Sequence, residues 1–266
     1  MVSAGLEALA SADVRLLEEA SRRGTVHVRL WSDDLVASVS GRLPSFPAAE
    51  RRFVLANLRY VHSVSVVTSP HAATRPLRGV RPGTIIAPRD LGTDRLRAAC
   101  EQAGVRYVEL GPDQLRGFPV SSGTEPQSPV ARRVIVSGCF DWLHSGHVEF
   151  FREAASLGEL HVVVGSDQNV RLLKGEGHPL QTAEERRYMV QAVRAVHRTW
   201  ISSGTGWMDA EPEIASIAPH VYVVNEDGDQ PQKRDFCRAR GLDYVVLRRR
   251  PHRGLRRRTS TDLRGF

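Results

Sequence analysis

The sequence predicts an α/β protein built from two tandem Rossmann-like domains, each a doubly wound parallel sheet. Three observations predict this fold: an internal repeat, an alternation of short β-branched runs with amphipathic helical patterns, and a linker-like stretch between the two copies. The chain has 266 residues, which is enough for two domains of modest size that each bury a hydrophobic core.

The internal repeat pairs three segments of the first half with three of the second. The matching pairs are "VHVRLWSD" (26–33) with "LHVVVGSD" (160–167), "PAAERRFVLANLRYVH" (47–62) with "QTAEERRYMVQAVRAVH" (181–197), and "CEQAGVRYVEL" (100–110) with "CRARGLDYVVL" (237–247). Between the copies lies "SSGTEPQSPVARR" (121–133), whose Ser, Pro and Gly content is typical of a linker. We therefore expect domains at 1–127 and 128–266.

The C-terminal copy has the clearer secondary-structure pattern. Its strands are expected at 133–137, 160–165, 198–201, 220–224 and 243–248, and its helices from near His147 to Gly158, from Thr182, and from about Gln230 to Arg240. Five parallel strands covered by helices place a ligand site beyond their carboxyl ends. In the N-terminal copy, residues 1–12 contain no β-branched run. This copy is therefore predicted to be truncated, with a four-stranded sheet that lacks the first strand.

Composition excludes several classes of protein. Apolar residues make up 41% of the chain and charged residues 25%, with no apolar run near the roughly 20 residues of a membrane helix and no signal-peptide pattern. We expect a cytoplasmic protein with no membrane insertion. Cys100, Cys139 and Cys237 form no CxxC pair, which predicts reduced thiols, no disulfide and no zinc site.

The net charge of +7 is local rather than general. Eight arginines fall between Arg248 and Arg264, so the basic excess belongs to the end of the chain. A short basic segment of this kind favours a phosphate group as the anionic partner and makes a nucleic acid unlikely.

The stretch "GCFDWLHSGH" (138–147) carries the chemistry. It follows the first strand of the C-terminal copy, and a helix is expected to begin within His144–His147, so free backbone N–H groups would form an anion site. Gly146 permits a close approach of phosphate, and the two imidazoles, one turn apart, can donate to its oxygens. No nucleophile stands beside a base, which predicts direct in-line displacement without a covalent intermediate. The alternative is that both histidines only cap and pack.

The segment "GCFDWLHSGHVEFFREA" resembles the HxGH nucleotidyltransferase superfamily, and within it the cytidylyltransferase-like branch that includes glycerol-phosphate, phosphoethanolamine and phosphocholine cytidylyltransferases. A second signature of that family has a counterpart in "RRRTSTDL" (256–263), and the resemblance covers about 130–266. It implies transfer of a nucleotidyl group, most often CMP from CTP with ATP as the alternative donor, to a phosphorylated alcohol, amino alcohol or sugar. It also implies release of pyrophosphate and Mg²⁺ bound through the phosphates of the nucleotide, without protein ligands.

The resemblance also implies roles for individual residues. His144 and His147 would contact the α-phosphate, and Arg258 is our choice among the arginines of 248–258 for the triphosphate. The final helix would begin at the residues that hold the β- and γ-phosphates, Thr259, Ser260 and Thr261. The turn that shapes the nucleotide pocket would comprise Gly138, Cys139, Phe140 and Asp141.

Three further residues match family positions outside the signature. Lys174, in the glycine-flanked "RLLKGEGHP", would bind phosphate on a loop whose closure excludes water; an exposed surface lysine is the alternative. Arg194 and Glu226 would lie near the nucleotide, although both also fit surface charges. Trp207 could cover an acceptor head group at the rim, but simple packing of Trp207 with Met208 is favoured.

The N-terminal copy lacks these groups. The repeat places Ala10 opposite His144, Ala12 opposite Gly146 and Asp13 opposite His147, so an acidic side chain stands where phosphate would sit. We predict a catalytically silent domain. This domain could replace the dimer partner of single-domain relatives or could hold a regulatory ligand. The sequence does not decide between these roles, nor whether the protein forms a homodimer.

Two other functions compete with cytidylyl transfer. "LKGEGHPL" and "EERR" also resemble the domains that activate heptose phosphates, which predicts an ATP-dependent enzyme making an ADP-activated sugar. A nonenzymatic nucleotide or nucleic-acid-binding protein is the alternative from another class. The sequence does not identify the phosphorylated acceptor.

Overall fold

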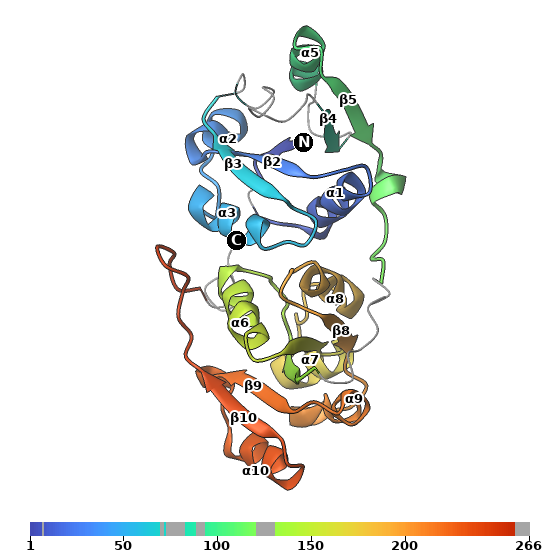
Figure 1. The fold of residues 1–266 in the computed structure, drawn as a ribbon, viewed down its shortest axis with the longest axis vertical. Helices are drawn as coiled ribbons and strands as arrows, with labels where there is room; N and C mark the ends of the chain where they lie inside the picture. The colour runs from blue at the N-terminus through green and yellow to red at the C-terminus, as the bar shows by residue number, and fades with distance from the viewer. Residues whose placement is uncertain (7, 70–71, 73–82, 89–93, 121–130, 259–266) are drawn as a thin grey trace. The chain divides into compact units, whose positions relative to one another are not determined.

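The computed structural model of the chain describes residues 1–6, 8–69, 72, 83–88, 94–120 and 131–258 (Figure 1). The chain divides into two compact units, Met1–Gly117 and Phe118–Phe266, called here the N-terminal and C-terminal units. Both are α/β units with a parallel sheet of five strands, which confirms the predicted fold class. No helix in the described part of the chain has the length and apolar character required to cross a bilayer.

The sheet of the C-terminal unit has the order β10-β9-β6-β7-β8. Its strands are β6 (Arg133–Gly138), β7 (Glu159–Val164), β8 (Arg198–Ile201), β9 (Val221–Asn225) and β10 (Asp243–Leu247). Each lies within one residue of its predicted bounds. The central strand β6 is parallel to both neighbours, with Val134 opposite Leu160 on one side and Val221 on the other. The end of β6, where the signature begins, is thus held in the middle of the sheet.

The helices of the C-terminal unit are α6 (Ser145–Ala155), α7 (Asp167–Lys174), α8 (Ala183–Gln191), α9 (Glu211–Ile217) and α10 (Pro231–Ala239), with short 3₁₀ turns η2 (Gly206–Met208) and η3 (Glu226–Gly228). Helix α8 begins after Thr182, as predicted, and the hydroxyl of Thr182 caps it by accepting from the N–H of Glu185. Lys174 ends a helix that the sequence reading treated as a loop. Helix α6 ends before Gly158, where an added Cβ would lie 2.0 Å from the carbonyl oxygen of Arg132.

The N-terminal unit has the same sheet in the same order, β3-β2-β1-β4-β5. Its strands are β1 (Val2–Ala4), β2 (His27–Trp31), β3 (Ser63–Val67), β4 (Thr84–Pro88) and β5 (Arg106–Leu110). The prediction of a missing first strand was therefore wrong. Strand β1 has only three residues, but Val2 pairs with both Val28 and Ile86. Backbone hydrogen bonds from two neighbouring strands make a β-branched run unnecessary in such a short central strand.

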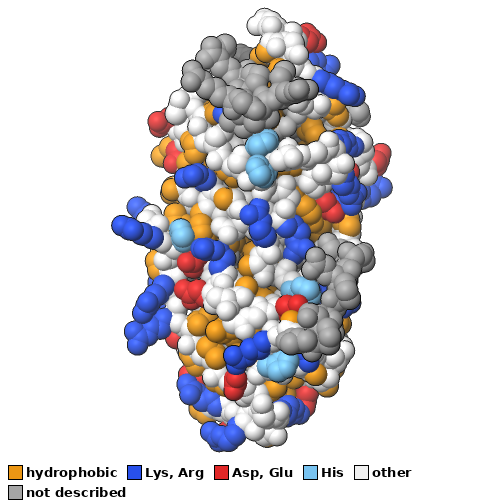
Figure 2. All heavy atoms as spheres, viewed as in Figure 1, with side chains coloured by type: hydrophobic (Ala, Val, Ile, Leu, Met, Phe, Trp, Pro, Cys, Tyr) orange, Lys and Arg blue, Asp and Glu red, His pale blue; other side chains and the backbone are white. Residues whose placement is uncertain are grey.

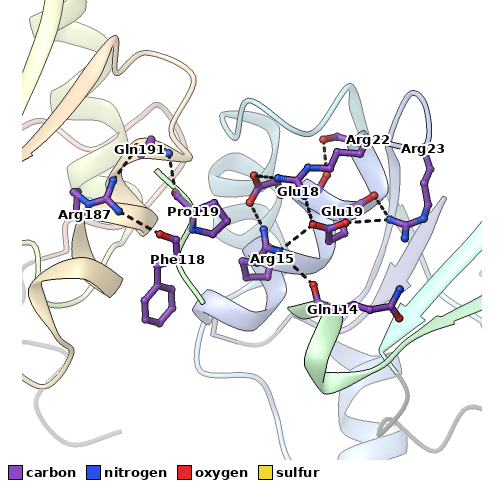
Figure 3. Close-up of polar contacts among 11 residues, drawn as sticks. Arg15, Glu18, Glu19, Arg22, Arg23, Gln114, Phe118, Pro119, Arg187 and Gln191 are labelled. Carbon is purple, nitrogen blue, oxygen red and sulfur yellow. Dashed lines mark hydrogen bonds and ion pairs between the residues drawn. The ribbon is translucent and has the colours of Figure 1, made fainter. Parts of the chain in front are cut away.

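The described helices of the N-terminal unit repeat those of the C-terminal unit in length. Helices α1 (Ser11–Ser21), α2 (Asp33–Ser40), α3 (Ala48–Ala56) and α5 (Asp94–Gln102) have 11, 8, 9 and 9 residues, as do α6, α7, α8 and α10. Helix α1 carries a network of ion pairs around the buried Arg15, which also donates to the carbonyl of Gln114 in η1 (Pro112–Leu115; Figure 3). The sequence repeat is therefore a repeat of structure.

The division between the two compact units falls between Gly117 and Phe118. The carbonyl of Phe118 accepts from Arg187, and that of Pro119 from Gln191, so this segment lies against α8 (Figure 3). The ring of Phe118 also contacts Tyr188, with 5.8 Å between centroids. These contacts place residues 118–119 with the C-terminal unit, ahead of the stretch whose composition is typical of a linker.

Candidate active site

The candidate site lies where β6 ends and α6 begins, at the carboxyl edge of the C-terminal sheet. Strand β6 ends at Gly138, and the backbone of Phe140 takes the left-handed region with φ of 51°. The ring of Phe140 turns back under the strand end, so that an added Cβ on Gly138 would lie 2.9 Å from it. The same ring contacts His147 edge-on, at 5.3 Å between centroids. Gly138 and Phe140 therefore shape the turn that carries the histidines.

His144 and His147 form a stacked pair at the start of α6. The two rings lie 3.9 Å apart between centroids and are inclined by 25°. His144 is the N-cap residue, and its Nδ1 accepts from the N–H of Gly146 at 3.1 Å. Because Nδ1 uses its lone pair in this bond, the neutral ring carries its hydrogen on Nε2. His144 therefore caps α6 with its Nδ1 and keeps its Nε2–H as a donor for another group.

Two buried nitrogen atoms of this pair have no hydrogen-bond partner among the described residues. They are Nε2 of His144 and Nδ1 of His147. A buried polar atom without a partner costs about 1–3 kcal/mol, so native structures seldom keep one without a reason. An anionic ligand at the helix start would supply the missing acceptor for the Nε2–H of His144 and would also meet the free backbone N–H groups.

Both imidazoles are neutral at physiological pH. Burial, and to a smaller extent the guanidinium groups of Arg249 and Arg258, lowers the pKa of His144 to about 3. The pKa of His147 lies well below its usual range, chiefly through burial and then through the neighbouring His144 and Arg249. His144 therefore offers a neutral Nε2–H donor, the ring of His147 is bonded to the backbone of Trp142, and the positive charge at the site comes from arginine and lysine.

The arginine-rich segment returns over the helix start. An added Cβ on Gly146 would lie 2.9 Å from Cε1 of His144 and 3.2 Å from the carbonyl oxygen of Arg258. The glycine is thus required by the His144 ring and the Arg258 backbone, in addition to any phosphate. Arg249 was missed by the sequence reading, because nothing in a run of eight arginines marks it; it pairs with Asp227 at 2.6 Å.

Lys174 reaches the signature from the end of α7. Its ammonium group lies beside the half-buried thiol of Cys139. Burial raises the pKa of this thiol, and the positive charge of Lys174 acts in the opposite direction by lowering it. The same charge contributes to the low pKa of His147. Gly175 and Gly177, next along the chain, have φ of 86° and 83°, which only glycine adopts readily. The structure therefore brings Lys174 to the histidines, as expected, but on a helix end.

Asp141 holds a neighbouring loop. Its carboxylate accepts from the N–H of Leu180 at 2.8 Å and of Gln181 at 3.1 Å, and it lies 3.3 Å from Nδ1 of His178. The charged side chains that act on the histidine pair are basic, and Asp141 is already engaged. This arrangement suits Mg²⁺ that arrives on a triphosphate better than a resident ion bound by carboxylates.

A buried arginine that the sequence reading missed positions several of these parts. Arg186 is fully buried at the start of α8. Its guanidinium and Nε donate to the carbonyls of Gln181 (3.0 Å), Cys139 (2.7 Å) and Gly165 (2.8 Å) and to the carboxylate of Asp167 (2.6 Å). It thus connects the signature turn, the end of β7 and the start of α7. The signal in the sequence was the match between "AERR" and "EERR" in the two copies.

Of the remaining predicted residues, some lie at the carboxyl edge of the sheet and others lie elsewhere or outside the described residues. Glu226 follows β9 at the carboxyl edge and lies 3.5 Å from Arg257. Arg194 is exposed in the turn between α8 and β8, which leads to the amino end of β8 and so away from the histidine pair. Thr259, Ser260 and Thr261 lie outside the described residues. Met208 is buried in the core, whereas Trp207 is 46% exposed and meets the edge of Phe236.

A family model described as "Cytidylyltransferase-like" matches residues 135–264, which include the whole candidate site. A "FAD synthase" from Aciduliprofundum boonei is 35% identical over 136 residues, which span 50% of this chain and 84% of that protein. A second "FAD synthase", from Thermococcus kodakarensis, is 33% identical over 123 residues, or 44% of this chain and 78% of that protein.

The HldE proteins match over a smaller share of their own length. "Bifunctional protein HldE" from Methylococcus capsulatus is 40% identical over 97 residues, but the chain spans only 20% of that protein. Among solved structures, a lipopolysaccharide core biosynthesis protein from Thermoplasma volcanium is 22% identical with a TM-score of 0.39, over 46% of this chain and 98% of that one.

Proposed function

The chain belongs to the cytidylyltransferase-like family of nucleotidyltransferases, and we propose that its C-terminal unit transfers a nucleotidyl group to a phosphomonoester with release of pyrophosphate. One observation carries the proposal: a stacked pair of neutral imidazoles at the N-terminus of a helix beyond the carboxyl end of the central strand, each with a buried nitrogen that has no partner among the described residues. This is where a doubly wound sheet binds its ligand.

The mechanism that this geometry supports is direct displacement at the α-phosphorus of a nucleoside triphosphate. The Nε2–H of His144 and the backbone N–H groups of α6 would donate to the α-phosphate oxygens as negative charge builds there, with His147 stacked behind His144. An oxygen of the acceptor phosphate forms the new bond to phosphorus while the bond to the β-phosphate bridging oxygen breaks. Pyrophosphate leaves with that electron pair, and no residue forms a covalent intermediate.

The cations around the histidines would balance the triphosphate. Lys174, Arg249 and Arg258 act electrostatically on the histidine pair and so surround the place where the phosphates would lie. Mg²⁺ bound to the nucleotide phosphates would neutralise further charge on the leaving group. Phosphate binding by Thr259, Ser260 and Thr261, and nucleotide contacts by Glu226 and Arg194, stay predictions.

The relatives change the expected donor. FAD contains an adenylate group joined to a flavin phosphate, and the two relatives named FAD synthase are covered over most of their length. We therefore place ATP ahead of CTP as the donor and a flavin phosphate first among the acceptors to be tested. HldE proteins fit an ATP donor as well, but the chain spans too little of them to carry over a sugar acceptor.

The N-terminal unit is proposed to be catalytically silent. Its equivalent helix start has Ala10 as the N-cap, and the carboxylate of Asp13 accepts from the N–H of Ala10 at 2.9 Å. The chain's own carboxylate thus takes the position of His147 and leaves neither an imidazole donor nor a favourable place for phosphate.

The test is pyrophosphate release from each of the four nucleoside triphosphates with Mg²⁺ and a panel of phosphomonoesters that includes FMN, glycerol 3-phosphate and sugar 1-phosphates. Substituting His144→Asn keeps a short side chain able to cap α6 but removes the Nε2–H donor. We expect kcat to fall by roughly 10²–10³-fold. Ala10→Asn, at the equivalent N-cap of the N-terminal unit, is the matched control and should leave kcat unchanged. Undiminished turnover by His144→Asn would refute the proposal.

The alternative function, nonenzymatic binding of a nucleotide or nucleic acid, predicts a different result in this assay. On the face drawn in Figure 2, Lys and Arg side chains are scattered among apolar and uncharged ones, without the continuous basic band that suits a nucleic-acid backbone. If no donor and acceptor pair released pyrophosphate while RNA bound with a steep dependence on salt, the binding function would replace the enzymatic one.

A further inference from the structure

Three side chains with metal-binding chemistry gather at the amino ends of β7 and β8. Glu159 begins β7, His161 follows two residues later, and His197 comes directly before β8. One ligand atom from each lies within 4.8 Å of those of the other two. This edge of the sheet is opposite the one that carries His144 and His147, so the cluster has no part in the proposed transfer reaction.

Two atoms of this cluster are buried without a hydrogen-bond partner among the described residues. His161 is fully buried and its Nε2 has no partner; the same holds for Oε2 of Glu159. The Nδ1 of His161 faces the indole N–H of Trp200 at 3.4 Å, so Nε2 is the nitrogen left for another partner. A buried donor or acceptor kept unsatisfied indicates a missing ligand.

We propose that Glu159, His161 and His197 bind a first-row transition metal ion such as Zn²⁺. Two imidazole nitrogens and one carboxylate oxygen are ligands that Zn²⁺ accepts, whereas Mg²⁺ and Ca²⁺ prefer oxygen alone. Three protein ligands leave a fourth position of a tetrahedral site for water. The absence of CxxC pairs predicted no zinc site, but this set of ligands uses no cysteine.

Metal binding would change one hydrogen bond. While Nδ1 of His161 accepts from Trp200, the neutral ring carries its hydrogen on Nε2, which must be free to bind a metal. Binding therefore moves the proton from Nε2 to Nδ1 and gives up the indole bond. At 3.4 Å this bond is longer than the usual 2.7–3.2 Å, so its loss costs little. Trp200 is thus a competitor of the metal.

Two guanidinium groups near the cluster already have other partners. Arg133 and Arg198 both act electrostatically on His161. Arg133 donates to the carbonyl of Ala218 at 2.7 Å, and Arg198 lies over the ring of Trp200 at 4.5 Å. The carboxylate of Glu159 is the group in the cluster that offsets this positive charge, and removing it should therefore affect binding strongly.

The N-terminal unit provides an internal comparison. His27 and His62 occupy the positions of His161 and His197, with 5.2 Å between ring centroids against 5.4 Å. Thr25 stands in place of Glu159, and Nδ1 of His27 is bonded to the hydroxyl of Ser63 at 2.7 Å. This copy keeps two imidazoles but has no carboxylate, so it should not bind the metal.

The experiment is calorimetric titration of the untagged, chelator-treated full chain with ZnCl₂ in the absence of nucleotide. We expect one equivalent of Zn²⁺ per chain. Glu159→Gln and His197→Asn should each weaken binding by at least about tenfold, and Trp200→Phe should strengthen it. His62→Asn, in the N-terminal unit, is the matched control and should change nothing. Co²⁺ in place of Zn²⁺ should give visible absorption typical of a tetrahedral site in the parent protein and not in Glu159→Gln.

Two results would overturn the inference: no binding above the level of the Glu159→Gln variant, or an equal loss in His62→Asn. Urea unfolding of each variant without metal shows whether a loss of binding reflects a loss of folding. Because nucleotide is absent from the titration, its outcome is independent of whether the transfer reaction occurs.

Discussion

The two units have the same framework but carry different side chains at the start of the helix that follows the first strand. In the C-terminal unit Arg186 donates to Gln181, Cys139, Gly165 and Asp167; in the N-terminal unit Arg51 donates to the equivalent Phe46, Gly5, Trp31 and Asp33. The turn after the first strand is kept as well, since Leu6 and Phe140 both have positive φ, of 48° and 51°.

What differs is the side chains that this framework presents. The N-cap is His144 in one unit and Ala10 in the other, and the position of His147 is taken by Asp13. The N-terminal unit keeps the buried arginine, as Arg51, although it lacks both histidines. The arginine therefore serves the fold rather than the chemistry of the site. Arg186 is therefore a positioning residue, and the comparison separates the scaffold of the site from its chemistry.

The largest expected effect on stability tests this separation. Arg186→Met and Arg51→Met should each lower the free energy of unfolding of their own unit by roughly 3–5 kcal/mol, because each leaves three carbonyls and a carboxylate without their buried partner. Hydrogen exchange resolved by peptide would assign each loss to its unit. Turnover should fall only with Arg186→Met. If only one of the two substitutions destabilised its own unit, the two arginines would not be equivalent.

Acidification should have opposite effects on stability through His144 in the C-terminal unit and through Asp13 in the N-terminal unit. The folded pKa of His144 is about 3, so between pH 7 and 5 the unfolded chain takes up the proton first and the C-terminal unit loses about 2 kcal/mol. Burial raises the pKa of Asp13 to about 6, so the folded N-terminal unit takes up a proton first and gains about 1 kcal/mol.

Matched variants isolate these two contributions from other titrating groups. His144→Asn should reduce the pH dependence of unfolding of the C-terminal unit, and Asp13→Asn that of the N-terminal unit. The measurement is urea unfolding at pH 5 and pH 7, followed by hydrogen exchange in each unit. A pH dependence of unfolding that neither variant changes would contradict the assigned pKa values.

The smallest expected effect concerns the start of α8 and its counterpart α3. Thr182→Ala removes the hydroxyl that accepts from Glu185 and should cost about 1 kcal/mol. At the equivalent Pro47 no side-chain cap exists; instead the carboxylate of Asp33 accepts from the N–H of Ala48 at 2.8 Å. Pro47→Ala should therefore remove no capping bond, and thermal unfolding of both variants would measure the difference.

Local patterns in the sequence predicted most of the C-terminal unit. The β-branched runs marked its five strands to within one residue, and the repeat assigned equivalent helices in both units. The signature was placed at the carboxyl end of the central strand because a strand followed by a glycine-bearing turn and a helix is a local pattern. Periodicity and turn residues are properties of neighbouring residues, so they can be read without the fold.

The tertiary structure decided the features that depend on distant residues. Strand β1 exists because Val2 lies between Val28 and Ile86, and Arg249 and Arg258 rather than other arginines approach His144 because the chain folds back over α6. Glu159 and His197 meet only because β7 and β8 are adjacent. In each case the deciding contact joins segments that are far apart in the sequence, and burial then sets the charge state of the side chains that meet there.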